Sequence, residues 1–124
     1  MEPSGRGRVL IIDDNVSLAE NIAEILQLDG YATEVAASAE EALSRAAPGR
    51  FEVVVTDYRL PDTNGAALVR QLRDIGLQAR AVVISAYTDD QTIADAASAG
   101  AAFVAKPVDF SLLGSAIGRP EVAA

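Results

Sequence analysis

The sequence predicts an α/β domain with an open, doubly wound sheet of five parallel strands and helices on both faces. Short apolar runs alternate with helix-type periodicity from one end of the chain to the other. The runs are apolar throughout, which is typical of parallel strands that helices cover on both faces. The polar breaks between segments are short, so each crossover fits a right-handed strand–helix–strand unit.

The first half of the chain predicts two strands and two helices. A strand over 9–12 precedes an amphipathic helix that Gly30 ends, and a strand over 32–36 precedes a short helix over 39–46. The apolar positions of the first helix recur at i, i+4, i+7 and i+8, and they are Leu18, Ile22, Ile25 and Leu26.

The second half predicts three further strands, over 51–57, 79–85 and 101–105. The third helix begins at Gly65 and turns Leu68, Val69 and Leu72 inward. The fourth, within "TDDQTIADAASAG", offers Ile93 and otherwise mostly alanine to the core, which is little apolar area to hold it in place. Asp109 is the expected N-cap of a last helix.

Composition excludes several classes of function. The 124 residues contain no cysteine and no histidine, so disulfides, thiol nucleophiles and imidazole chemistry are absent. The formal net charge of −8 argues against a nucleic-acid partner. No apolar run approaches the roughly 20 residues needed to cross a bilayer. We expect a cytoplasmic protein with one domain over 1–124 and its core at about 7–118.

Polar residues end four of the five predicted strands. Asp13 and Asp14 follow the first, Asp57 ends the third, Ser85 ends the fourth, and Lys106, the only lysine, follows the fifth. The carboxyl ends of parallel strands meet at one sheet edge, where this class of fold binds ligands. Each residue also has an ordinary explanation, such as helix capping, a turn, or a loop lysine. Capping cannot explain all three acids.

The chemistry of this set indicates phosphoryl transfer. Three carboxylates are oxygen ligands of the kind that Mg²⁺ prefers, and a cation would offset their mutual repulsion. A lysine can neutralise a phosphoryl oxygen, and a serine can donate a hydrogen bond to it. The group left to attack phosphorus is a carboxylate. The residues therefore indicate phosphoryl transfer to an aspartate.

Over essentially its whole length the sequence resembles the receiver domain of bacterial two-component response regulators, a family that includes chemotaxis regulators. Four segments carry the resemblance in the family's order and spacing: "VLIIDDN", "VVVTDYRLPDTNG", "VVISAY" and "FVAKPVD". The resemblance implies the flavodoxin-like strand order 2-1-3-4-5. It also implies a signalling switch that catalyses its own aspartyl phosphorylation and dephosphorylation, rather than a metabolic enzyme.

The resemblance implies a role for each residue of the site. Asp57 would accept the phosphoryl group from a phosphohistidine of a histidine kinase or a histidine phosphotransfer protein. Asp14, Asp57 and the backbone carbonyl of Arg59 would hold Mg²⁺, with Mn²⁺ as an alternative, and Asp13 would reach the ion through water. Lys106 would pair with the phosphoryl oxygens.

Further positions would carry the switch. Ser85 would turn toward the phosphoryl group and draw the following loop with it. Phe103, where many members have tyrosine, would turn inward, biased by packing alone because it has no hydroxyl. The Lys106–Pro107 bond would be cis. The face formed by the fourth helix, fifth strand and fifth helix would transmit the signal to a downstream protein target.

Arg59 and Tyr87 occupy the positions that flank the path of a hydrolytic water in this family, where two bulky side chains would slow dephosphorylation. We expect a monomer in the unphosphorylated state, with neither a membrane nor a direct nucleic-acid partner. The alternative is a pseudo-receiver, an interaction module that works without phosphorylation. It predicts a missing acceptor, acid pair or lysine, and none is missing. A nucleotide binder is disfavoured because Asp13 and Asp14 would repel phosphate, and an aspartyl phosphatase would need insertions for which this chain is too short.

Overall fold

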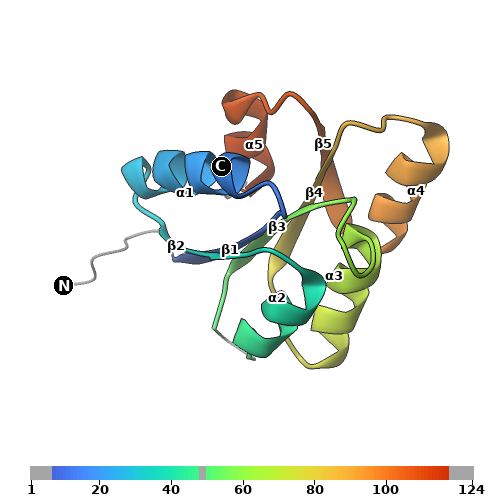
Figure 1. The fold of residues 1–124 in the computed structure, drawn as a ribbon, viewed down its shortest axis with the longest axis horizontal. Coiled ribbons are helices and arrows are strands. Elements are labelled where there is room, and N and C mark those ends of the chain that lie inside the picture. The colour runs from blue at the N-terminus through green and yellow to red at the C-terminus, as the bar shows by residue number, and fades with distance from the viewer. Residues whose placement is uncertain (1–6, 48–49, 118–124) are drawn as a thin grey trace, which may run out of the picture.

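The structure is a computed structural model that describes residues 7–47 and 50–117, and within these ranges five strands alternate with five helices (Figure 1). The strands are β1 (Arg8–Ile12), β2 (Ala32–Ala36), β3 (Val53–Asp57), β4 (Arg80–Ser85) and β5 (Ala101–Ala105). The helices are α1 (Val16–Leu28), α2 (Ala39–Arg45), α3 (Gly65–Asp74), α4 (Asp90–Ser98) and α5 (Phe110–Ile117). Residue 118, where the predicted core ends, lies outside the described ranges.

All five strands are parallel, in the order β2-β1-β3-β4-β5, so the predicted sheet topology is confirmed. The order places β1 and β3 side by side at the centre. β3 is buried along its whole length, as the continuous apolar run predicts. Among the helices of the described ranges, none combines the length and apolar content that a bilayer span requires.

Helices cover both faces of the sheet (Figure 1). Ile22 of α1 and Leu113 of α5 belong to one buried cluster with the alternate strand residues that point to their side. Ala42 of α2 and Leu68 of α3 belong to a second cluster on the opposite face. α4 lies beside α3 and against β5. The buried residues of the two clusters are aliphatic apart from Tyr31 in the first and Phe51 in the second, as the composition predicts.

The orientation of α4 differs from the prediction. Ile93 does not face the core and is 38% exposed, whereas Thr92 and Ala96 are the buried residues of this helix. Polar contacts fix the rotation. The Thr92 hydroxyl and backbone N–H both bond the N-cap carboxylate of Asp89, and Asp95 is paired with Arg70 of α3. These polar contacts stabilise the observed orientation of α4 more than burial of the Ile93 side chain would stabilise the predicted one.

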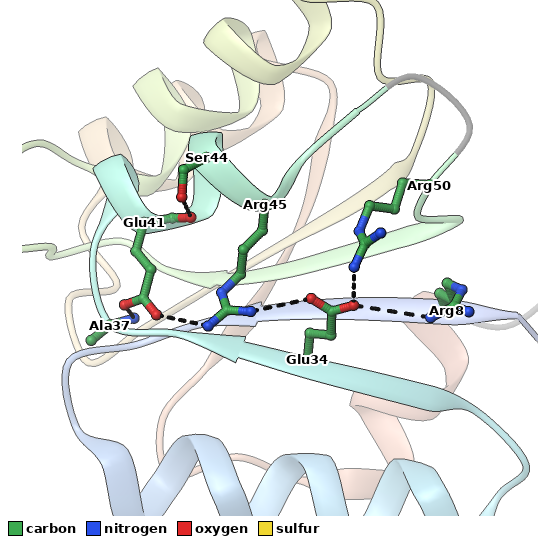
Figure 2. Close-up of polar contacts among 7 residues, drawn as sticks. All are labelled: Arg8, Glu34, Ala37, Glu41, Ser44, Arg45 and Arg50. Carbon is green, nitrogen blue, oxygen red and sulfur yellow. Dashed lines mark hydrogen bonds and ion pairs between the residues drawn. The ribbon is translucent and has the colours of Figure 1, made fainter.

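The edge strand β2 carries a network of ion pairs on the side of α2 (Figure 2). Glu34 contacts three guanidinium groups, those of Arg8, Arg45 and Arg50, at 4.0, 3.4 and 2.5 Å. Arg45 also pairs with Glu41, one helical turn before it, at 3.1 Å. Charges along an edge strand oppose its pairing with a strand of another molecule. The network therefore joins β2 to α2 and protects this edge of the sheet.

The start of α3 packs directly against the end of β3. A Cβ atom on Gly65 would lie 2.5 Å from the backbone oxygen of Asp57 and 3.0 Å from Cγ2 of Thr56. The Gly65 N–H also donates to the Tyr58 carbonyl at 2.7 Å. The absence of a side chain at Gly65 thus sets the distance between the first turn of α3 and the carboxyl end of β3.

Replacing two glycines by alanine should change stability in opposite directions. Gly65→Ala should lower the free energy of unfolding by about 1–3 kcal/mol, because the new methyl group overlaps backbone that has no room to move. Gly114→Ala, in α5, has no atom within 4 Å of the new Cβ and should raise it by about 0.5–1 kcal/mol. Urea unfolding of both variants measures the difference. Equal effects would show that the close approach at Gly65 does not constrain the fold.

Candidate functional site

The predicted site residues meet at the carboxyl edge of the sheet. Adjacent strands end in register there: Ile12 is opposite Thr56, Asp57 is opposite Ile84, and Ser85 is opposite Ala105. Asp13 follows β1 directly and Lys106 follows β5 directly. The sheet topology therefore brings together polar residues that are up to 93 positions apart, from Asp13 to Lys106.

Three carboxylates form the centre of the site. Asp13, Asp14 and Asp57 each place one oxygen within 4.8 Å of the others. Asp13 is 1% exposed and Asp57 7% exposed, whereas Asp14 is open to solvent. Lys106 supplies the opposing charge, with its Nζ 3.2 Å from Asp57 Oδ1 and 3.5 Å from Asp13 Oδ2. One ammonium group thus pairs with two of the three acids, Asp13 and Asp57.

The local electrostatics disfavour this much negative charge. Burial raises the pKa of the Asp57 carboxyl above its usual value, and the neighbouring Asp13 charge raises it further, while Lys106 opposes both. Asp13 Oδ2 is buried and has no hydrogen-bond partner among the described residues. Its ion pair within the described ranges is the 3.5 Å contact with Lys106 Nζ, and in an all-oxygen cluster such a buried oxygen fits a hard divalent cation such as Mg²⁺.

Neither Asp13 nor Asp14 is the N-cap of α1. That position belongs to Asn15, whose side chain accepts the N–H of Leu18 at 3.1 Å. Asp13 Oδ1 instead accepts the N–H of Asn15 at 2.9 Å, which holds the carboxylate toward the sheet edge. The capping explanation for the aspartate pair is therefore wrong, and both acids are left for the site.

Ser85 and the residues around it connect the site to β5. Ser85 is 1% exposed, and its Oγ accepts the N–H of Tyr87 at 2.9 Å. Its carbonyl oxygen accepts the N–H of Lys106 at 2.8 Å. The Lys106–Pro107 peptide bond is cis. Ser85 therefore bonds both the loop after β4 and the backbone of the site lysine.

Two predicted residues of the site contact each other. The guanidinium carbon of Arg59 lies 4.3 Å from the centroid of the Tyr87 ring, within cation–π distance. The stack joins the loop after β3 to the loop after β4. Phe103 is half-buried in β5, opposite Val83.

Sequence reasoning missed two polar residues in this region. Asp62, in the loop after β3, accepts the N–H groups of Ala39 and Glu40 at the start of α2, and these bonds lower the pKa of its carboxyl. The Tyr58 hydroxyl donates to Asp95 of α4 at 2.8 Å. In each of these contacts the two residues are more than 20 positions apart along the chain, so no local sequence pattern predicts them.

Comparisons with known proteins agree with this geometry. A family model described as the response regulator receiver domain matches residues 9–118. A response regulator receiver protein of Anaeromyxobacter is 43% identical over 102 residues, covering 82% of this chain and 43% of the relative. The transcriptional regulatory protein FixJ of Rhizobium meliloti is 35% identical over 112 residues, covering 90% and 55%. The chain thus spans about half the length of these curated relatives.

A solved structure has the same fold. It is a response regulator of Burkholderia pseudomallei with a phosphorylated aspartic acid, a calcium ion and citrate. Its TM-score is 0.81 at 32% sequence identity, and the match covers 90% of this chain and 66% of that one. The pseudo-receiver alternative finds no support, because Asp57, the acid pair and the lysine that it predicts to be incomplete are all present and lie together at one edge. The chain belongs to the response regulator receiver domain family of two-component signalling.

Proposed function

We propose that this domain accepts a phosphoryl group on Asp57, in a Mg²⁺-dependent reaction with a phosphohistidine of a histidine kinase or phosphotransfer protein. The observation that supports it most directly is the position of Asp57. Its carboxylate is within 4.8 Å of two further carboxylates and 3.2 Å from the only lysine. A nucleophile, a set of cation ligands and a positive charge are thus in one place.

The transfer would proceed by attack of an Asp57 oxygen on phosphorus. A P–O bond forms and the P–N bond breaks. The electron pair of the P–N bond passes to the imidazole of the donor, and Asp57 becomes an acyl phosphate. Lys106 would pair with the phosphoryl oxygens. Asp13, Asp14, Asp57 and the Arg59 carbonyl would hold the cation, with Asp13 acting through water. The chemistry that Mg²⁺ supplies when bound is neutralisation of the charge on the acids and the phosphoryl group.

Ser85 and Phe103 would report the phosphorylated state. The Ser85 hydroxyl accepts the Tyr87 N–H, so when it turns to donate to the phosphoryl group this hydrogen bond either breaks or moves with it. In both cases the loop after β4 would move. Phe103 lies in the neighbouring strand β5 and would turn inward as that loop shifts. The face built from α4, β5 and α5 would then present the change to a downstream protein.

The same proposal covers the partners. Residues 1–124 would act as one receiver domain that is monomeric when unphosphorylated, with a protein as its downstream target. The charge of −8 supports the absence of direct nucleic-acid contact by this chain. FixJ is a transcriptional regulatory protein, and the match covers 55% of its length, so nearly half of that relative lies outside the match.

Incubation with acetyl phosphate or phosphoramidate and Mg²⁺ should add one phosphoryl group, measured by intact mass. The gain should disappear in EDTA and in Asp57→Asn, because each removes a component of the site. Asp62→Asn is the matched control, since this carboxylate bonds the start of α2. Phosphorylation of Asp57→Asn to the wild-type extent would place the acceptor elsewhere. No phosphorylation of the wild type would support the pseudo-receiver.

The Arg59–Tyr87 stack should slow loss of the phosphoryl group. We expect the double variant Arg59→Ala, Tyr87→Ala to dephosphorylate several-fold faster than wild type, because removal of the two side chains opens a path for water. Decay of the phosphorylated fraction by intact mass measures the rate. Arg50→Ala is a suitable control, since Arg50 also lies over a ring, Phe51, but at the opposite end of the sheet. Unchanged decay in the double variant would contradict this role.

A further inference from the structure

We propose that Tyr58 and Asp95, together with Arg70, form a tether that holds α4 in its unphosphorylated position and couples it to Asp57. The proposal rests on the proposed function, since it takes Asp57 as the phosphoacceptor. It adds a connection from the acceptor to α4 that runs through the residue directly after Asp57. This connection is separate from the path through Ser85 and Phe103.

The backbone of Tyr58 is fixed to the site on both sides. Its N–H donates to the Ile84 carbonyl at 2.8 Å, and its own carbonyl accepts the Gly65 N–H at 2.7 Å. Its ring is half-buried against a small apolar cluster between α3, β4 and β5. A displacement of the Asp57 backbone therefore displaces the Tyr58 ring, which has little freedom to move independently.

The tip of the Tyr58 side chain reaches α4. Its hydroxyl donates to Asp95 Oδ2 at 2.8 Å, and Arg70 Nη2 donates to Asp95 Oδ1 at 2.8 Å. Arg70 also contacts the Ser98 hydroxyl at 2.6 Å, one turn later in α4. The Arg70 and Tyr58 hydrogen bonds lower the pKa of Asp95, so the carboxylate is charged and both bonds are charge-assisted.

Polar contacts matter more for α4 than for the other long helices. Its buried residues are Thr92 and Ala96, whereas α1 buries two large aliphatic side chains, Ile22 and Leu26, and α3 buries Leu68 among others. Burial of about one methyl group and one hydroxyl-bearing side chain provides little hydrophobic free energy. The tether therefore supplies a large share of what holds α4, and its loss should let the helix open locally.

Energetic coupling between two sites is reciprocal. If the tether is stronger in the unphosphorylated arrangement, removing it favours the phosphorylated arrangement and tightens the binding of a phosphoryl analogue at Asp57. A residue that merely stabilises α4 equally in both arrangements would not change that affinity. The two possibilities differ in one measurable quantity, the affinity for beryllofluoride in the presence of Mg²⁺.

The test compares Tyr58→Phe with wild type by hydrogen exchange and by beryllofluoride titration. In EDTA, the backbone amides of α4 should exchange about fivefold faster or more in the variant, with the amides of α1 unchanged. With Mg²⁺, beryllofluoride should bind about fivefold more tightly, at the lower end of typical coupling. Asp95→Asn weakens the contact with Arg70 as well, so its effects should be at least as large. Adding Tyr58→Phe to Asp95→Asn should change them little, because the contact between Tyr58 and Asp95 is then already weakened.

Tyr31→Phe provides the matched control, since it removes a hydroxyl next to the end of α1 and should leave both quantities unchanged. Unchanged exchange in α4 of Tyr58→Phe would overturn the tether. Faster exchange with unchanged beryllofluoride affinity would overturn the coupling and leave a purely structural contact. Failure of wild type to bind beryllofluoride would instead overturn the proposed function, while the exchange measured in EDTA would still judge the tether.

Discussion

Repulsion among three clustered aspartates, only two of which pair with a lysine, is the constraint on which the site depends. The carboxylates lie within 4.8 Å of one another, two of them are buried, and Lys106 is the only ammonium side chain in the sequence. A protein selected for stability alone would place fewer charges there. The cluster holds together because the parallel sheet fixes the strand ends, and its excess negative charge favours a bound cation.

The elements around the site connect that charge to the surface. Gly65 lets α3 approach the carboxyl end of β3, and Ser85 bonds the loop after β4 as well as the backbone of Lys106. Tyr58 extends from the carboxyl end of β3 to Asp95 in α4. Two series of contacts thus connect Asp57 to the surface, one that leads to β5 and one that leads to α4. Because α4 buries little apolar surface, a small change at the site can move it.

Much of the fold could be predicted from the sequence, because periodicity and strand ends are local. The alternation of elements, the parallel sheet and the convergence of Asp13, Asp57, Ser85 and Lys106 at one edge follow from such patterns. The rotation of α4 was predicted wrongly, since its partner Arg70 is 25 positions from Asp95. The contact between Tyr58 and Asp95, 37 positions apart, has no local pattern at all. Contacts between side chains of distant elements require the folded structure.

The most direct measurement is the free energy of unfolding of Asp57→Asn in EDTA and in Mg²⁺. Burial and the Asp13 charge raise the pKa of Asp57, so at neutral pH its ionised form is less stable in the fold than in the unfolded chain. The variant should therefore be more stable than wild type in EDTA, and should lose most of the stabilisation that Mg²⁺ gives wild type. Asp74→Asn, an exposed change at the end of α3, should do neither. Lower stability of Asp57→Asn in EDTA, with the Mg²⁺ effect retained, would contradict a site built on carboxylate repulsion.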